Sequence, residues 1–492
     1  MNWQDVYEKK IVSAEEAVKI VKSRDRVVMT GSTDQPKVLP QALFARKSEL
    51  RDVEIVWGLP LGDPGFFLPG SEDSFKTVIA SFIGPMLRTV VNERRTEFIP
   101  NSFASLPKPT ERTGEKDCDV YMVTLSPPNK QGFCSLGGEL WGKKEMLYGA
   151  RKTIAEVDNN QLWYYGDTTV HISEIDYFVE HTPRTFTLEE IPSLIGNIEP
   201  ESRREQVAEF LKELPRSQHG TFLSLLPFFS AIDDQMFGHA LESMGILVPE
   251  VARPIAGYVS SLVEDGDTFQ IGMGSPSQYI PRLGAFDNKH DLGYHAEMTA
   301  RGVGDLIRNG IITGKSKNLH QGKAVFSSLT GLGPNEMEWC SENPGVELYG
   351  TTYVTNMKTV AANDRMVSIN NAISVDLTGQ ICSETALGTR IINGPGGQPE
   401  SHIGAYFSKG GKAITVLPST ALEGAVSNIC ALFDQGTVVT IPRTFADFVV
   451  TEYGIARLAG KTLRERANEL IAVAHPDFRA ELRKEAEKLY WP

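Results

Sequence analysis

The stretch TFQIGMGSPSQ, residues 268–278, predicts a short buried strand that runs directly into a glycine-rich turn. Gly272 and Gly274 stand where this strand ends, and a glycine there lets the backbone approach a ligand closely. A tight turn without a ligand is the alternative, because the GxGxxG dinucleotide fingerprint is incomplete. The same succession of strand, turn and helix recurs along the chain, and it decides the fold class.

Strand and helix patterns alternate through the first 190 residues. The runs RVVMTGS (26–32), VEIVWGLPLG (53–62) and CDVYMVTLSPP (118–128) are apolar and β-rich, whereas PQALFARKSEL (40–50) has a helical pattern. This alternation predicts an α/β fold built on buried, largely parallel sheets. We expect an N-terminal α/β domain over residues 1–190.

The rest of the chain predicts a helical connector over 191–255 and a second α/β domain over 256–492. Strands of that second domain are expected at 268–274, 323–329, 346–354, 366–376, 412–419 and 437–443. Two stretches resemble each other weakly, SPPNKQGFCS (126–135) and SVDLTGQICS (374–383). Each predicts a strand end, a glycine turn and a return strand, which suggests that the two α/β halves are related.

The composition is that of a globular protein without an affinity for polyanions. With 492 residues, 41% hydrophobic residues and a net charge of −13, the chain is expected to form two or three domains and to bind neither nucleic acid nor membrane. The five cysteines are scattered, and the N-terminus has no signal-peptide pattern, which favours reduced thiols and a cytoplasmic location. No histidine or cysteine spacing is typical of a zinc site, so we expect no metal.

Glu297 is a lone acidic side chain in DLGYHAEMTARGVGDLIRNG (291–310). Val303, Leu306 and Ile307 follow at helical spacing, so a helix-entry acid favoured by the helix dipole is the simplest interpretation. A catalytic carboxylate is the other interpretation.

Two further loops could contact a ligand. INGPGGQPES (392–401) places Gly394, Gly396 and Gly397 around a proline, and the fixed N–H groups of such a loop suit an oxyanion. Lys409, in SKGGKAI (408–414), could meet phosphates, although exposed lysines are most often only solvated. A plain loop is the alternative for the glycines.

Several motifs together resemble the acetyl-CoA hydrolase/transferase family, in its 4-hydroxybutyrate and butyrate CoA-transferase branch. The resemblance covers nearly the whole chain. It is carried by GYHAEM (293–298), INNAISVDLTGQ (369–380), GPGGQ (394–398), VVTIPRTFADFVVTEYGIARLAG (438–460), SPPNKQGFCSLG (126–137) and GDTTVHISEID (166–176).

The resemblance implies a family I CoA-transferase in which Glu297 attacks an acyl-CoA thioester. An acyl-glutamyl anhydride and a glutamyl-CoA thioester would follow in a ping-pong sequence that passes CoA to a short-chain acid without a metal. The oxyanion and CoA contacts are then assigned to Gly272, Met273, Gly274, Ser275, Pro276, Asn370, Gly394, Gly396, Gly397 and Lys409. Pro276 falls one place earlier than in the GxGxxP turn of the family.

Alternatives stay open within this resemblance. An acyl-CoA hydrolase would use the same glutamate with water, and a non-catalytic CoA-binding protein would need neither. A homodimer or homotetramer is expected. The acyl pocket could be lined by Trp57, Phe103, Trp163 and Tyr165, with core packing as the alternative for each. His171 and Asp176 are expected to be structural.

Overall fold

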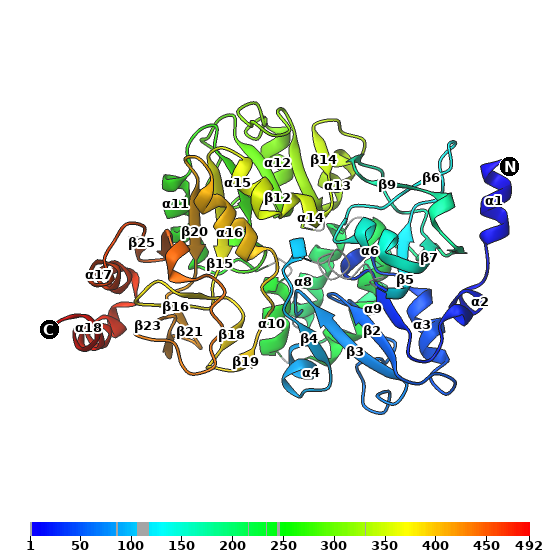
Figure 1. The fold of residues 1–492 in the computed structure, drawn as a ribbon, viewed down its shortest axis with the longest axis horizontal. Coiled ribbons are helices and arrows are strands. Elements are labelled where there is room, and N and C mark those ends of the chain that lie inside the picture. The colour runs from blue at the N-terminus through cyan, green and yellow to red at the C-terminus, as the bar shows by residue number, and fades with distance from the viewer. Residues whose placement is uncertain are drawn as a thin grey trace. The chain divides into compact units, whose positions relative to one another are not determined.

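The computed structural model describes residues 2–84, 87–105, 118–214, 216–232, 234–243, 247–329 and 331–492. The chain divides into two compact units (Figure 1). The first unit comprises Met1–Phe237 with Ser327–Thr352, and the second comprises Gly238–Phe326 with Tyr353–Pro492. Each unit has a mostly parallel sheet with helices around it, which confirms the α/β prediction. No helix within these described residues is long and apolar enough to cross a bilayer.

The sheet of the first unit has seven strands in the order β10-β7-β5-β1-β2-β3-β4, and each adjacent pair is parallel. The chain passes from β1 to β2, β3 and β4 on one side, and then returns to β5 on the other side of β1. The carboxyl ends of β1 and β5 therefore form the topological switch point of this sheet. The strands are β1 (Arg26–Met29), β2 (Val53–Trp57), β3 (Phe75–Ala80), β4 (Glu97–Ile99), β5 (Cys118–Leu125), β7 (Ala150–Val157) and β10 (Tyr177–Glu180).

The helix α3 shows how a buried charge sets an element boundary in this unit. The N-cap residue of α3 (Val38–Ala45) contributes no side-chain cap. Instead, the carboxylate of Glu156, near the end of β7, accepts hydrogen bonds from the backbone N–H groups of Lys37, Val38 and Leu39 at 2.8, 2.9 and 3.2 Å. These N–H groups have no partner inside the helix, so the carboxylate fixes where the helix begins.

The segment predicted as a connector, 191–255, contains helices and no strand among its described residues. They are α7 (Ile191–Leu194), α8 (Glu201–Lys212), α9 (Arg216–Ala231), α10 (Asp234–Ser243) and α11 (Ala252–Leu262). The predicted boundary at 255 falls inside α11, which packs on strands of the second unit. The three-part division of the chain stays a prediction.

The sheet of the second unit runs β25-β24-β20-β15-β11-β12 and continues to β13. From β24 to β12 the pairs are parallel, whereas β25 is an antiparallel edge strand. The strands are β11 (Thr268–Ile271), β12 (Gly293–Met298), β13 (Ala324–Ser328), β15 (Met366–Asn371), β20 (Lys412–Val416), β24 (Phe448–Thr451) and β25 (Gly454–Arg457). The helices of the later chain are α12 (Val303–Arg308), α13 (Pro334–Cys340), α14 (Thr351–Val354), α15 (Met357–Ala362), α16 (Gln398–Phe407), α17 (Leu463–Val473) and α18 (Pro476–Tyr490).

The strand predicted at 437–443 is wrong. This segment makes only an isolated bridge, between Ile381 and Ile441, and Val438 and Val439 are each 39% exposed. Pro442 also lacks the N–H that a strand inside a sheet would donate. The strand of the sheet is instead β24, whose Val449 and Val450 are fully buried. Apolar composition alone did not separate the two segments.

The two stretches that resemble each other in sequence share a turn design in the structure. In the first, the side chain of Asn129 accepts backbone hydrogen bonds from the residues two and four positions later, at 2.9 and 3.0 Å. In the second, Asp376 does the same at 3.0 and 2.9 Å. A glycine with positive φ closes each turn, Gly132 at +84° and Gly379 at +94°. The chain returns after these turns in β6 (Phe133–Ser135) and β17 (Ile381–Cys382), as the sequence predicts.

Candidate active site

Glu297 lies in a strand, which corrects the expected helix-entry position. It is the fifth residue of β12, and α12 begins only at Val303, after a turn that contains Gly302 with φ +91°. The sequence pattern located the helix but not the preceding strand, whose glycine and histidine are poor strand signals. The carboxylate is therefore placed by a sheet, and it is half-buried.

Three predicted site segments reach the same level of the sheet. The register pairs Phe269 with Tyr294 and Ile271 with Ile369. Counting onward, Gly272 stands level with Glu297 on one side and with Asn370 on the other. The three strands are neighbours in the order β12-β11-β15, about 4.8 Å apart. Binding sites of parallel sheets lie at such carboxyl ends.

The strand that carries Glu297 is fixed by buried polar contacts. His295 is 1% exposed, and its Nε2 lies 2.9 Å from the carbonyl oxygen of Val354. Burial lowers the pKa of His295 to about 3, so this ring is neutral and holds the strand rather than transferring a charge. Lys317 donates to the carbonyl oxygen of Tyr294 at 2.9 Å. Burial, together with the nearby charge of Glu297, raises the pKa of the Tyr294 phenol.

The glycine turn after β11 is held by one asparagine that the sequence interpretation missed. The side chain of Asn371 donates to the carbonyl oxygen of Met273 at 2.9 Å and accepts from the N–H of Ser277 at 2.9 Å. Gly274, between them, has φ +104°, a conformation that side-chain-bearing residues rarely adopt. The turn therefore has a fixed shape before any ligand arrives.

Asn370 closes the other side of the turn. A Cβ atom added to Gly272 would lie 2.8 Å from Asn370 Oδ1, so glycine alone leaves room for this amide. Asn370 Nδ2 donates to Ser368 Oγ at 2.6 Å and to Ser401 Oγ at 3.3 Å. Ser368 Oγ in turn accepts from Gln270 Nε2 at 2.8 Å. This buried network orients the amide that the family resemblance assigns to the oxyanion or CoA contacts.

The loop 394–397 leads into α16 and reaches the same network. Gly396 has φ +54°, and Gly397 is the N-cap of α16. Ser401, in the first turns of α16, contacts Asn370, and Gln398 Nε2 donates to the carbonyl oxygen of Asn371 at 3.1 Å. Gly394 N–H is directed to its neighbouring side chain, Asn393 Oδ1, at 2.8 Å. The structure thus brings the loop, the turn and Asn370 together.

Lys409 is not brought to this edge. Its carbonyl oxygen accepts from the N–H of Arg365, directly before β15 begins, and β20 begins three residues after it. Lys409 is therefore exposed at the amino ends of the strands, whereas Glu297 lies near the carboxyl end of β12. Its expected contact with CoA phosphates lacks support from this position.

Comparison with known proteins decides the family. The family described as "Acetyl-CoA hydrolase/transferase N-terminal domain" matches residues 1–188, and "Acetyl-CoA hydrolase/transferase C-terminal domain" matches residues 333–486. The chain belongs to the acetyl-CoA hydrolase/transferase family. The expected identity of the protein as an enzyme of this family is confirmed.

Relatives within the acetyl-CoA hydrolase/transferase family resemble this chain over its full length. It is 35% identical to the 4-hydroxybutyrate coenzyme A transferase of Clostridium kluyveri, over 100% of both chains. A solved 4-hydroxybutyrate CoA-transferase from Porphyromonas gingivalis is 30% identical over 99% of this chain and 100% of that one, with a TM-score of 0.70. RipA from Yersinia pestis is 27% identical over the full length of both chains, with a TM-score of 0.79. An acetyl-CoA hydrolase from Candida albicans is 21% identical over 97% of this chain and 89% of that protein.

The aromatic side chains expected near an acyl group divide into two groups. Trp57 is fully buried and donates from Nε1 to the carbonyl oxygen of Thr30 at 3.0 Å, and Phe103 stacks on Trp141. These two side chains pack inside the first unit, which agrees with the alternative that they are core residues. Trp163 is half-buried and Tyr165 is 50% exposed.

The two family positions near the end of the first domain have structural contacts. Asp176 accepts hydrogen bonds from the backbone N–H of Thr153 at 2.9 Å and from Lys152 Nζ at 2.7 Å. His171 Nδ1 lies 2.8 Å from Ser173 Oγ, and His171 is the N-cap residue of the short 3-10 helix Ile172–Glu174. Among the described residues, no group of histidine, cysteine and carboxylate side chains could hold a metal ion.

Proposed function

We propose that this protein transfers CoA between an acyl-CoA and a free carboxylic acid, with Glu297 as the nucleophile. The proposal rests on one observation: Glu297, Gly272 and Asn370 lie side by side on three neighbouring strands, at the carboxyl edge of one sheet. The relatives with the higher identities support transfer, because those at 28 to 35% identity are named CoA transferases.

The proposed reaction begins with attack of the Glu297 carboxylate on the thioester carbonyl. The C–S bond breaks, CoA leaves as a thiolate, and an acyl-glutamyl anhydride remains. The thiolate then attacks the glutamyl carbonyl, which releases the first acid as its carboxylate and leaves a glutamyl-CoA thioester. The incoming carboxylate reverses these two steps and leaves as the new acyl-CoA. Carboxylate and thiolate exchange negative charge at each step, so no net proton transfer is required.

The fixed backbone around the site supports the charged steps. Each attack places negative charge on a carbonyl oxygen, and preorganised N–H donors stabilise that charge without having to reorient. We assign this role to the N–H groups of residues 273–275, in the turn fixed by Asn371, and to those of Gly396 and Gly397 before α16. Replacing the nucleophile and disturbing the turn should therefore have different kinetic effects.

Hydrolysis is the second candidate, because relatives at 21 and 23% identity are named acetyl-CoA hydrolases. Water would then open the glutamyl-CoA thioester or the anhydride in place of a carboxylate. We propose short-chain acids as acceptors, since the named transferases act on 4-hydroxybutyrate, butyrate and acetate. A homo-oligomer in the cytoplasm is proposed with this function.

A trapping experiment tests the proposal. The protein is incubated with butyryl-CoA and no acceptor, digested, and searched by mass spectrometry for CoA on the peptide that contains Glu297, while free CoA is followed in parallel. A glutamyl-CoA adduct with little CoA release supports the transferase. Steady CoA release without an adduct favours the hydrolase, and neither signal with butyryl-CoA, acetyl-CoA or 4-hydroxybutyryl-CoA contradicts both.

A further inference from the structure

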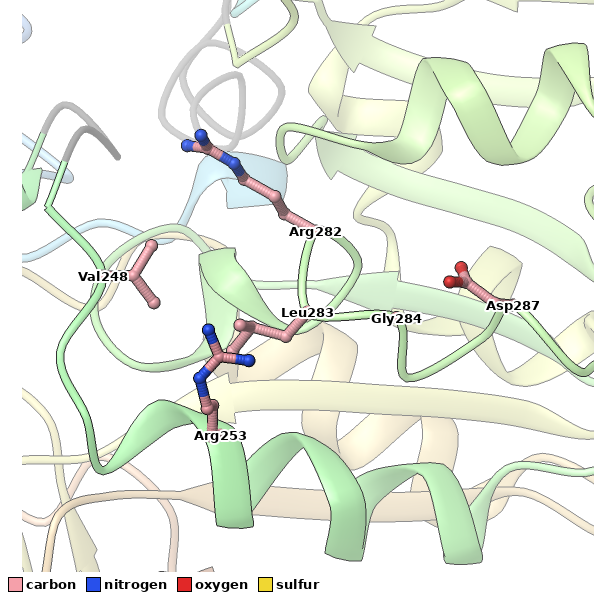
Figure 2. Close-up of a pocket in the computed structure, with 6 residues that line it drawn as sticks. All are labelled: Val248, Arg253, Arg282, Leu283, Gly284 and Asp287. Atoms are coloured by element: carbon pink, nitrogen blue, oxygen red, sulfur yellow. The ribbon is translucent and has the colours of Figure 1, made fainter.

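Two places outside the proposed site gather charged side chains. The second unit has a cavity of about 430 Å³, and Figure 2 shows its lining side chains, which are Val248, Arg253, Arg282, Leu283, Gly284 and Asp287. Among these lining residues no lysine or cysteine occurs, so the cavity offers neither an amine nor a thiol. The other place is the start of α3 in the first unit, where the side chain of Lys37 is half-buried.

The amine of Lys37 has uncharged hydrogen-bond partners. Its Nζ donates to the carbonyl oxygen of Thr33 at 3.5 Å and to Thr221 Oγ1, on α9. Within the described part of the chain, Lys37 forms no ion pair. An ammonium group has three N–H donors, whereas a neutral amine has two N–H donors and a lone pair. Lys37 therefore keeps both of its hydrogen bonds when the amine loses a proton.

The carboxylates near Lys37 are bound to other groups. Asp34 has its own ion pair, at 2.9 Å, and the two oxygens of Glu156 accept the backbone hydrogen bonds at the start of α3. Asp158 Oδ1 accepts from the backbone N–H of Asn160 at 2.8 Å. Burial lowers the pKa of Lys37 from 10.5 to about 8, and the nearby negative charges only partly oppose this fall.

Lys10 shows the opposite arrangement. Its Nζ donates to the carbonyl oxygens of Ile172 at 3.0 Å, Ser173 at 3.4 Å and Ile175. All three N–H groups of its ammonium are used, so the loss of a proton would break a hydrogen bond. Lys10 is half-buried like Lys37, and burial lowers its pKa as well. The number of hydrogen bonds thus distinguishes two lysines that are both half-buried.

We propose that Lys37 is a modification site, at which its neutral amine is acylated by acyl-CoA thioesters. The nitrogen attacks the thioester carbonyl carbon, the C–S bond breaks, and CoA leaves as its thiolate. The nitrogen then loses one proton, which the thiolate or water takes up, and an amide of Lys37 remains. Nothing is oxidised or reduced in this step. The choice of acyl-CoA as the donor rests on the proposed function, because a CoA-transferase meets these thioesters as its substrates.

Acylation removes a positive charge from the carboxyl edge of the first sheet. The resulting amide has one N–H, so it keeps at most one of the two hydrogen bonds that Lys37 makes to Thr33 and Thr221. The contact between the segment after β1 and α9 is thereby weakened. The modification would thus make this contact depend on how much acyl-CoA the protein has met.

Mass spectrometry that resolves single lysines tests the proposal. The full-length protein is incubated with butyryl-CoA at about pH 7.5 and digested with a protease that does not cleave at lysine, and the butyryl-lysine peptides are quantified over time. We expect Lys37 to react about tenfold faster than Lys22, an exposed lysine of the same unit, because its gain in neutral amine outweighs its loss of basicity. Lys10 should also react more slowly than Lys37. A rate at Lys37 that does not exceed both controls overturns the proposal.

The pH dependence of the acylation is a second test. The rate at Lys37 should rise up to about pH 8 and then level off, because the amine is then mostly neutral. At an ordinary exposed lysine the rate continues to rise up to about pH 10. Lys37→Arg keeps the positive charge and should remove only the signal at this position. A rate at Lys37 that is still rising steeply above about pH 9 contradicts the proposed site.

The variant Glu297→Gln separates the modification from CoA transfer. Direct attack on the thioester does not need Glu297, so Lys37 should be acylated at an unchanged rate in this variant. Acylation that is lost in the variant shows that the acyl group comes from an enzyme-bound anhydride, which overturns the direct reaction. A protein that acylates Lys37 but transfers no CoA retains this site and rejects the proposed function, whereas transfer without acylation of Lys37 does the reverse.

Discussion

The carboxyl edges of the two parallel sheets use polar residues in opposite ways. In the first unit, Asp34 follows β1 at the switch point and pairs with Lys143 at 2.9 Å, with both side chains almost completely buried. In the second unit, the corresponding edge carries two glycine-rich segments, two asparagines and the half-buried Glu297. The first edge thus holds a buried ion pair, whereas the second edge carries the half-buried carboxylate that we propose as the nucleophile.

This difference shows why buried charge alone does not identify a site. Glu156 in the first unit is 1% exposed, yet its carboxylate only accepts hydrogen bonds from the backbone at the start of α3. Lys143 Nζ also donates to the carbonyl oxygen of Leu136 at 2.6 Å. Such a network supports the fold, whereas the second edge places a half-buried carboxylate level with a glycine turn. The following changes test this division, from the largest expected effect to the smallest.

Removing the carboxylate of Glu297 should have the largest effect. We expect Glu297→Gln to lower the rate of CoA transfer at least about 10⁴-fold, because the amide cannot form the anhydride. Unfolding in urea should remain close to that of the wild type. The measurement is initial rates with butyryl-CoA and acetate, with Glu481→Gln on the exposed face of α18 as control. A loss of less than tenfold would show that another group is the nucleophile.

Breaking the ion pair of the first edge should instead affect stability. Lys143→Met leaves the Asp34 carboxylate buried without its cation, which should lower the free energy of unfolding by about 3–5 kcal/mol. Urea unfolding followed by circular dichroism measures this change. Lys152→Met is the control, because Lys152 forms an exposed pair with Asp176 and should cost less than about 1 kcal/mol. Equal effects of the two substitutions would contradict the structural role of the first edge.

The first edge should also give stability a pH dependence through Asp158. Burial raises the pKa of Asp158 from 3.8 to about 6. The folded state then binds more protons than the unfolded state between these values, so the free energy of unfolding falls as pH rises from about 4 to about 6. The fall is about 2–3 kcal/mol for this group. Asp158→Asn should make the free energy of unfolding, measured in urea at pH 4 to 7, depend less steeply on pH. An unchanged pH dependence would show that other groups cause it.

The smallest effect should come from the glycine turn of the second edge. Gly274→Ala forces a side-chain-bearing residue to φ +104°, which costs about 1 kcal/mol of strain. We expect the KM for butyryl-CoA to rise, with only a slight loss of stability. Gly460→Ala is the matched control, since Gly460 also has a positive φ, +74°, and nothing within 4 Å of an added Cβ. If both variants raise the KM equally, the turn has no specific role.

The fold was predictable where local pattern and tertiary structure agree. Alternating strands and helices predicted both sheets, and the shared turns at Asn129 and Asp376 were visible as a weak repeat. The strand at 437–443 was predicted wrongly because this segment differs from β24 in its burial, and burial depends on the whole fold. The strand β12 was missed because its GYHAEM sequence is held by tertiary contacts of Tyr294 and His295 rather than by strand propensity.

The sequence predicted the glutamate and the glycine turn that the structure places at the same edge of one sheet, but it did not predict the residues that support them. Asn371 could have been found, since the sequence repeats asparagine at 370 and 371, but only the register shows which one holds the turn. Lys409 was assigned to CoA by its charge and its nearness in sequence to the loop 394–397, although a ten-residue helix carries it to the other end of the strands.

The register of β11, β12 and β15 has a consequence for how this chain can change in length. Successive residues of a strand face opposite sides of a sheet, so one residue inserted between Gly293 and Ala296 would turn Glu297 to the other face. The same insertion in the turn 299–302 leaves the carboxylate in place. Insertions and deletions near Glu297 should therefore be tolerated outside β12 but not within it, and a scan of single-residue insertions through 290–303 would map the segment that must keep its length.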